Sequence, residues 1–241
     1  MNYLDQLLFG YYPYICLTVF LLGSLIRFDR DQYTWKSDSS QLLRVGQLRW
    51  GSNLFHIGIL FLLGGHSMGL LTPHFVYEPF ISAPDKQLMA IVSGGLFGLL
   101  GFIGVSILLH RRLSDDRIRI NSKTSDIVML VLLWLQFALG LATVPVSAHH
   151  LDGAMMMRLA EWAQHIVTFR AGASDFLAGA GLIFKAHMFL GMTIFLVFPF
   201  TRLVHVWSGI GVLAYIVRPY QLVRSRRLGM TPGTPLSQRQ N

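Results

Sequence analysis

Five apolar runs, each long enough to cross a lipid bilayer as a helix, constrain the fold of this chain more than any other feature. They cover residues 8–26, 55–71, 89–109, 127–146 and 182–206. A spanning helix needs about 17–25 mostly apolar residues, and continuous rather than alternating runs favour helices over a transmembrane barrel. Only 13% of the 241 residues are charged, whereas soluble domains average about 25%. The sequence therefore predicts an all-α integral membrane protein with five transmembrane helices.

The basic residues cluster on one side of the predicted spans. All but four of the 20 lysines and arginines lie after the first or third run or at or beyond the end of the fifth, and the exceptions are Lys86, Arg158, Arg170 and Lys185. The positive-inside rule then predicts an amino terminus outside and a carboxyl terminus in the cytoplasm. The same distribution explains the formal net charge of +8. We therefore expect membrane lipid, and no nucleic acid, as a partner.

The chain is predicted to form one domain with a tail. Residues 1–226 make the five-helix membrane domain, and residues 227–241, rich in Pro, Gly and polar residues, are predicted to be a disordered cytoplasmic tail. Within the outer connection, apolar residues recur at three- and four-residue steps, which predicts an amphipathic helix at the outer interface. These residues are Met155, Leu159, Trp162, Ile166 and Phe169.

Four of the nine histidines fall inside spans. They are His56 and His66 in the second run and His187 and His205 in the fifth. An ionisable residue inside a span is a functional candidate, although an interhelical hydrogen bond is the simpler alternative. Two such residues on each of two helices favour a shared function. The other five histidines lie in loops or at span ends, where water can solvate them.

Helix geometry predicts how these histidines pair. Ten residues place His66 about 80° around the helix from His56, and eighteen residues align His187 with His205. Because the two spans run in opposite directions, His56 faces His205 near the cytoplasm and His66 faces His187 near the outside. The rises along the two helices are about 15 Å and about 27 Å. Their average predicts two metals about 21 Å apart.

Haem fits these pairs better than a bare metal ion. Each site has two imidazoles, and zinc or non-haem iron would need more protein ligands. A porphyrin supplies four nitrogens and leaves two axial positions. The single cysteine, Cys16, excludes a disulfide within the chain, a cluster held by this chain alone and c-type attachment. The sequence therefore predicts two b haems within the bundle.

Small and basic residues near the histidines admit two interpretations. The glycines near the span histidines leave room for a flat cofactor, or they serve ordinary helix packing. They are Gly58, Gly64, Gly65, Gly69 and Gly191. Arg111 and Arg112, at the inner end of the third span, are candidates to pair with haem propionates. Alternatively, they are ordinary positive-inside residues.

Several motifs resemble the gamma subunit of bacterial membrane-bound respiratory nitrate reductase. They are QYTW (32–35), SNLFHIGIL (52–60), GLLTPH (69–74), FPFTRLVHVWS (198–208) and YQLVR (220–224). The resemblance implies a five-helix cytochrome b with two b haems. It assigns His56 and His205 to the inner haem, and His66 and His187 to the outer one. This agrees with the pairing predicted from topology.

The resemblance also implies a function. The family's partners are an iron–sulfur beta subunit and a molybdenum alpha subunit that reduces nitrate. The substrate of this subunit would be menaquinol or ubiquinol, oxidised near the outer haem at the bacterial inner membrane, with protons released outside. Lys86 corresponds to a lysine of the family's quinol site, and Gly65 and His66 would form another wall. Ser147 is a weaker candidate, and a snorkelling interfacial lysine is the alternative for Lys86.

A mechanism follows for the two haems. Arg111, Arg112 and Arg202 would stabilise the reduced inner haem and raise its potential above that of the outer haem. Other interpretations of the chain stay open at this point. A di-haem cytochrome b of a sulfur or heterodisulfide reductase would share the haems. A histidine-relay transporter or a simple membrane anchor would have none.

Overall fold

A computed structural model describes residues 3–30, 45–120 and 122–207, and the contacts below belong to the compact unit Met1–His205. The described residues form helices and contain no strand. Among them, the helices long and apolar enough to cross a membrane are Tyr3–Arg30, Gly46–Leu71, Ala83–Ser114, Thr124–Ala148 and Leu182–Phe200. The prediction of five spanning helices is confirmed. The predicted tail and residues 208–226 of the predicted domain lie outside the described residues.

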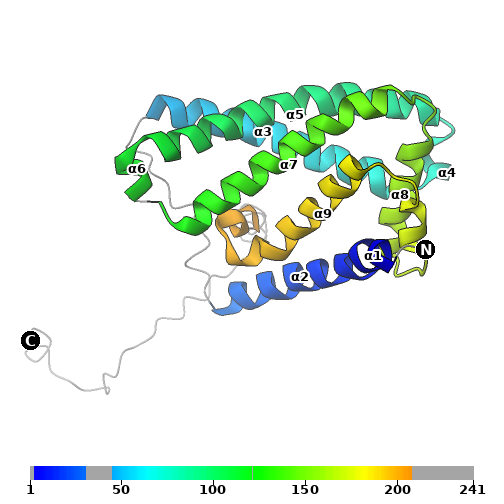
Figure 1. Cartoon of the computed structure of the whole chain (residues 1–241), viewed down its shortest axis with the longest axis horizontal. Coiled ribbons are helices and arrows are strands. Elements are labelled where there is room, and N and C mark those ends of the chain that lie inside the picture. The colour runs from blue at the N-terminus through cyan, green and yellow to red at the C-terminus, as the bar shows by residue number, and fades with distance from the viewer. Residues whose placement is uncertain (1–2, 31–44, 121, 208–241) are drawn as a thin grey trace, which may run out of the picture. The chain divides into compact units, whose positions relative to one another are not determined.

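The spanning helices lie side by side (Figure 1). Their long elements are α2 (Tyr12–Arg30), α3 (Val45–Leu71), α5 (Ala83–Ser114), α7 (Thr124–Ala148) and α9 (Leu182–Val197). They pack in the order α3, α5, α7, α9, α2. The short helices α4 (His74–Tyr77) and α6 (Asp116–Ile120) follow α3 and α5. A Cβ at Gly58 would collide with Gly101, so glycine allows α3 and α5 to approach closely.

The first span contains a change of helix type at a proline. It begins as α1 (Tyr3–Gln6), widens into the π-helix η1 (Leu7–Tyr11) and continues as α2. Pro13 has no N–H, so it cannot make the usual helical hydrogen bond to the carbonyl of Phe9. The indole Nε1 of Trp162 donates to that carbonyl instead, at 2.9 Å. The side chain of a distant helix thus satisfies the oxygen that the proline leaves unpaired.

The amphipathic helix predicted in the outer connection exists as α8 (Ala154–Val167), but its apolar face packs on protein. It runs across one end of the bundle (Figure 1), which we call the α8 end. Trp162 and Ile166 are buried with Phe9 and with Leu177 of η3 (Ala173–Leu177). The apolar face of α8 therefore covers a protein core left by the spans, and the position of the helix at the outer interface stays a prediction. Phe169 follows the helix and is exposed.

The fifth span is shorter than predicted. α9 ends at Val197, and the chain continues through the 3₁₀ turns η4 (Phe198–Phe200) and η5 (Arg202–Val204). Pro199 lacks the N–H that would extend the helix, and the Thr201 hydroxyl accepts from the N–H of Leu203, which starts a new turn. His187 and His205 therefore do not share one straight helix. The straight helix assumed for the predicted rise of about 27 Å is wrong, whereas the separation of about 21 Å between the two metals stays a prediction.

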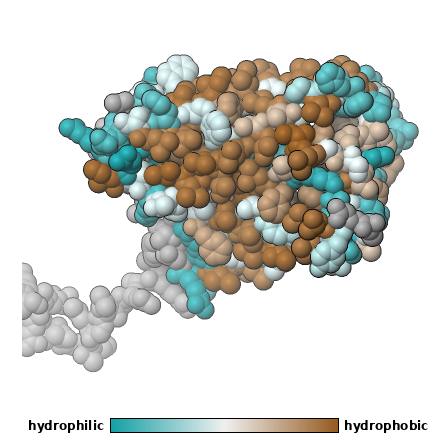
Figure 2. Space-filling model, in the orientation of Figure 1, coloured by the Kyte–Doolittle hydropathy of each residue, from teal (hydrophilic) through white to brown (hydrophobic). Residues whose placement is uncertain are grey.

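The outer surface suits a lipid environment. Figure 2 shows apolar side chains across the middle of the face in view and polar side chains gathered toward the ends. Large apolar residues are exposed on each long helix, among them Leu21, Leu60, Val92, Leu135 and Phe189. Exposure of so broad an apolar band to water would be unfavourable, whereas its exposure to lipid hydrocarbon is not.

Candidate functional site

The four span histidines come together as two pairs. The ring centres of His56 and His205 lie 6.4 Å apart, and those of His66 and His187 lie 6.3 Å apart. His56 and His66 belong to α3, His187 to α9, and His205 follows η5. These are the partners expected from the opposite directions of the two spans. Because α3 is one continuous helix, the pairs are separated by about 15 Å along it.

The spacing within each pair matches two rings on opposite sides of one metal ion. A metal–imidazole bond is about 2 Å long, and the ring centre lies about 1 Å behind its nitrogen, which predicts ring centres roughly 6 Å apart. A direct N–H···N hydrogen bond would bring the centres to roughly 5 Å. Both observed separations agree with the metal-bridged arrangement.

Three of the four rings are held so that Nε2 is available as a ligand. The Nδ1 atom of His56 lies 2.7 Å from the carbonyl oxygen of Ser52, and that of His66 lies 2.7 Å from the carbonyl oxygen of Leu62. For His205, Nδ1 lies 2.6 Å from the carbonyl oxygen of Arg202. A carbonyl only accepts, so each Nδ1 donates and carries the ring proton. Each Nε2 is left with a lone pair, which a metal requires.

The ring of His187 is held by packing. A Cβ added to Gly140 of α7 would lie 3.0 Å from Cε1 of His187, so any side chain at this place would crowd the ring. The Nδ1 atom of His187 is buried and has no hydrogen-bond partner among the described residues. A buried nitrogen without a partner indicates that the site is built for a further interaction.

The glycines near the histidines separate into two groups. Gly58 is in close contact with α5, as ordinary helix packing requires, and Gly191 faces the side chain of Gln136. A Cβ at Gly64, Gly65 or Gly69 would meet nothing within 4 Å. The α3 face beside His66 is thus open, as a flat cofactor requires. No three His, Cys, Asp or Glu side chains gather into a metal site in the described ranges, so the donor set is two imidazoles per pair. These residues fit haem.

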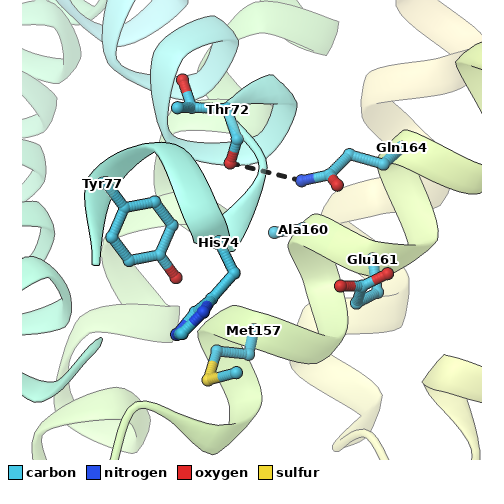
Figure 3. A pocket seen from close by; sticks show the side chains of 7 residues that line it. All are labelled: Thr72, His74, Tyr77, Met157, Ala160, Glu161 and Gln164. Atoms are coloured by element: carbon cyan, nitrogen blue, oxygen red, sulfur yellow. Dashed lines mark hydrogen bonds between the residues drawn. The ribbon is translucent and has the colours of Figure 1, made fainter. Parts of the chain in front are cut away.

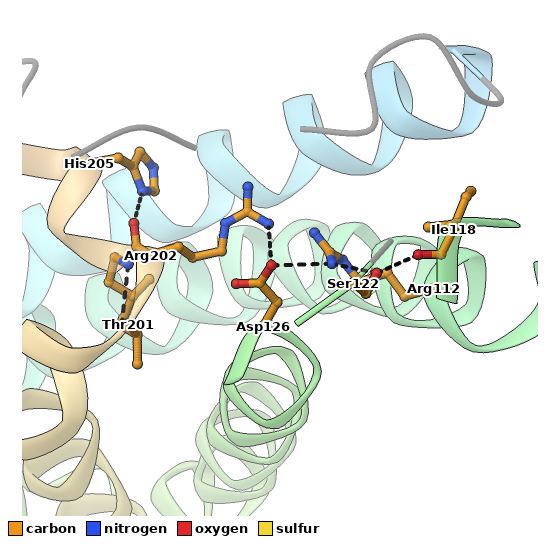
Figure 4. Close-up of polar contacts among 8 residues, drawn as sticks. Arg112, Ile118, Ser122, Asp126, Thr201, Arg202 and His205 are labelled. Carbon is orange, nitrogen blue, oxygen red and sulfur yellow. Dashed lines mark hydrogen bonds and ion pairs between the residues drawn. The ribbon is translucent and has the colours of Figure 1, made fainter. Parts of the chain in front are cut away.

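At the opposite end from α8, the segment that carries His205 is tied to two helices through one acid (Figure 4). Asp126 of α7 is buried, and its Oδ2 lies 3.5 Å from Arg112 of α5 and 3.6 Å from Arg202 of η5. Arg112 also donates to the hydroxyl of Ser122 at 2.8 Å. Arg202 provides the carbonyl that accepts from Nδ1 of His205. By holding Arg202, Asp126 therefore also positions the His205 ring. We call this end the Asp126 end.

The two arginines proposed for propionate binding are both buried at the Asp126 end. Arg111 is 1% exposed and Arg112 is 9% exposed. Arg112 is already engaged by Asp126 and Ser122, and the negative charge of Asp126 offsets one of the positive charges there. Whether either guanidinium pairs with a propionate stays a prediction.

Lys86 lies at the α8 end with its ammonium turned into the protein. The residue is only 8% exposed, and Nζ donates to the carbonyl oxygen of Gly69 at 3.2 Å. Nζ also lies 3.5 Å from the centre of the Tyr77 ring, a cation–π contact. A snorkelling lysine would extend toward water. Lys86 instead reaches the open glycine face that continues from His66.

A pocket opens beside this lysine, between α4 and α8 (Figure 3). It is lined by Thr72, His74, Tyr77, Met157, Ala160, Glu161 and Gln164. Burial raises the pKa of the Tyr77 phenol, and the charges of Glu78 and Glu161 raise it further. The phenol therefore stays neutral, and its ring remains a good partner for the Lys86 ammonium.

Ser147 lies near the end of α7, at the α8 end, and contributes its carbonyl. That oxygen accepts from Nε2 of the buried Gln87 at 3.1 Å, and Oε1 of Gln87 accepts from the N–H of Gly153 at 2.7 Å. Gln87 thus joins α5, α7 and the start of α8 directly beside Lys86. The contacts of Ser147 are structural, and its proposed role toward quinol stays a prediction.

Sequence reasoning missed three polar residues: Asp126, Gln87 and Gln136. The sequence does contain a signal for each of them, because Gln136 interrupts an apolar run and the other two lie at the ends of runs. A polar residue inside a span indicates a specific partner. The partner itself depends on how the helices are rotated, which the sequence does not state.

The fold and the paired imidazoles define a multi-pass membrane protein with metal-binding potential in its bundle. The nitrate reductase gamma subunit family model matches residues 5–226, and the chain belongs to this family. It is 53% identical over 228 residues to the respiratory nitrate reductase 2 gamma chain of Escherichia coli, covering 94% of this chain and all of that one. It is 50% identical over 226 residues to the respiratory nitrate reductase 1 gamma chain of the same organism, with the same coverage.

A third relative comes from another organism. The nitrate reductase gamma chain of Bacillus subtilis is 40% identical over 222 residues, covering 92% of this chain and 98% of that one. The likeness thus extends over nearly the whole length of both proteins. The protein is a membrane subunit of respiratory nitrate reductase, a multi-subunit oxidoreductase.

Proposed function

We propose that this chain is a di-haem cytochrome b that oxidises quinol at the outer face of the bacterial inner membrane. The observation that carries the proposal is the spacing of 6.3–6.4 Å between the rings of both histidine pairs. His66 and His187 would hold an outer b haem through Nε2, and His56 and His205 an inner one. When bound, the two haems supply one-electron carriers across the bundle.

The quinol site lies at the α8 end in this proposal. Lys86 is already placed to donate from its ammonium, and the open face at Gly65 and Gly69 admits a flat ring beside His66. The Lys86 ammonium binds a quinol oxygen and stabilises negative charge on it as the hydroxyl proton leaves. Two electrons enter the chain and two protons leave to the outside for each menaquinol or ubiquinol oxidised.

The Asp126 end faces the cytoplasm and the partner subunits. Electrons pass from there to an iron–sulfur beta subunit and on to a molybdenum alpha subunit, where nitrate is reduced. The family membership supports these partners, since a gamma subunit implies others. The positive-inside distribution of basic residues supports the orientation.

A spectrum of membranes that contain the assembled complex tests the proposal. Quinol addition should produce split b-type absorption bands, and subsequent nitrate should remove them. Purified complex without pigment would refute the haem assignment. If quinol reduces the pigment but nitrate does not reoxidise it, the assignment as a cytochrome stands and the nitrate-linked role is refuted.

The relative potentials of the two haems give a sharper test. Arg111, Arg112 and Arg202 outnumber Asp126 near the inner site, so the net positive charge should stabilise the reduced form there and raise its potential. A His66→Leu variant should lose the outer haem and keep the higher-potential one in a redox titration. If the surviving haem has the lower potential, the assignment of the pairs to potentials is wrong.

A further inference from the structure

Gln136 takes no part in the function proposed above, yet it places an amide in the middle of an apolar span. It lies on α7, and its Oε1 atom is buried with no hydrogen-bond partner among the described residues. Burying an amide oxygen without a partner is unfavourable. A residue that bears this cost at a lipid-buried position is expected to have a partner in the working protein.

A second unpaired atom faces the same interface from α9. Nδ1 of His187 is also buried without a partner among the described residues. Gly140, one turn after Gln136, contacts the His187 ring, and Gly191, one turn after His187, contacts the Gln136 amide, with a built Cβ 3.1 Å from Nε2. The main chain of Gln136 also interacts with the ring. The two unpaired atoms therefore belong to one stretch of the α7–α9 contact.

His187 differs from the other three span histidines in its support. The rings of His56, His66 and His205 each donate Nδ1 to a carbonyl of their own segment. A metal-bound histidine almost always donates its second ring N–H to an acceptor, which fixes the tautomer and orients the ring. Among the described segments, the main chain of Gln136 contacts the ring, and its side-chain Oε1 is a buried acceptor without a partner at the same α7–α9 contact.

We propose that the side-chain oxygen of Gln136 accepts a hydrogen bond from Nδ1 of His187 and is the positioning residue of that ligand. The inference rests on the proposed function, in which His187 binds iron through Nε2. The proposed bond requires the Gln136 side chain to rotate, because its Nε2 atom now lies toward Gly191. The bond keeps the proton on Nδ1 and makes Nε2 a more basic ligand. A more basic ligand favours the oxidised iron, so Gln136 lowers the potential of the outer haem.

Two substitutions with opposite effects test the proposal in the assembled complex. Gln136→Leu keeps the size and removes the acceptor, so the midpoint potential of the outer haem should rise by about 59 mV, a tenfold change for one electron. Gln136→Glu provides a stronger acceptor, so that potential should fall. The inner haem should stay unchanged in both variants. A redox titration followed by absorption and electron paramagnetic resonance separates the two haems.

The matched control is Thr193→Val, on the same helix as His187. It removes the hydrogen bond to the Tyr12 hydroxyl and thus perturbs the packing of α9. We expect it to leave the outer potential unchanged. A shift in this variant as large as that of Gln136→Leu would mean that any packing change moves the potential, and would overturn the proposal.

The possible results separate a failure of the role of Gln136 from a failure of the proposed function. A wild-type complex without haem would refute both the proposed function and the role of Gln136. A wild-type complex with two haems, and Gln136 variants whose outer potential stays constant or moves in the same direction, would overturn the role of Gln136 and leave the function intact. If Gln136→Leu fails to assemble, Gln136→Glu decides: a fall in the outer potential supports the proposal, and no change refutes it.

Discussion

At the scale of single residues, Lys86 is the group that the proposed function places in contact with quinol. Its ammonium is buried between the Gly69 carbonyl and the Tyr77 ring, so little water competes for it. In Lys86→Ala we expect the KM for quinol to rise about 10–100-fold, because a hydrogen bond from a charged group contributes about 1.5–3 kcal/mol. This KM is measured by steady-state quinol oxidation with membranes that contain the complex.

The matched control for Lys86 is another basic residue at the same end. Arg158 lies on α8 and is exposed, so Arg158→Ala removes a positive charge without touching the open glycine face. Its KM should stay at the wild-type value. Equal KM values for Lys86→Ala and the wild type would show that the lysine does not contact quinol.

Gly140 is a residue whose importance comes from having no side chain. A Cβ there would lie 3.0 Å from Cε1 of His187 and would push the ring out of line with His66. In Gly140→Ala, the affinity for the outer haem should therefore fall about tenfold, while the inner haem is retained. The split absorption bands measure both. Gly94→Ala is the control, since its Cβ would meet nothing within 4 Å. Normal outer haem in Gly140→Ala would contradict the proposed ring position.

At the scale of elements, the broken fifth span is held by charge. η5 follows a proline and is short, so its position depends on other helices: Arg27 of α2 donates to the carbonyls just before it, and the Asp126 carboxylate lies between Arg112 and Arg202. That contact joins α5, α7 and η5. It explains how His205 can face His56 although it is not on the α9 helix.

Removal of that carboxylate should therefore weaken the whole Asp126 end. In Asp126→Asn the buried Arg112 and the partly buried Arg202 lose a counter-ion, and we expect a destabilisation of about 3 kcal/mol. Heat-induced loss of the inner haem spectrum should occur at a lower temperature. Asp152→Asn, an exposed acid at the α8 end, is the control. If the two variants melt alike, Asp126 is not the link that holds η5.

At the scale of the whole molecule, orientation across the membrane decides on which side the proposed quinol oxidation would release its protons. Asp152 lies at the α8 end and Asp116 at the Asp126 end, and both are exposed, whereas the native Cys16 is buried. In spheroplasts a membrane-impermeant maleimide should label Asp152→Cys and not Asp116→Cys. The reverse pattern would place quinol oxidation on the cytoplasmic side and invalidate the proposed route of the protons.

The sequence by itself determined the five spans and the partners of the four histidines. Apolar length is a local property, and the alternating direction of successive spans then places His66 opposite His187 and His56 opposite His205. Each of these inferences needs only the order of residues along the chain. Lys86 also stood out locally, as a basic residue at the start of a span.

Only the tertiary structure decided which polar groups meet. Whether α8 covers lipid or protein, whether Asp126 joins two arginines, and whether Gln136 meets Gly191 of α9 all depend on how each helix is rotated about its axis. That rotation is set by contacts between residues far apart in sequence, such as Gly58 against Gly101 and Trp162 against Phe9. Hydrophobic length carries no information about rotation, because lipid solvates every apolar face of a spanning helix alike.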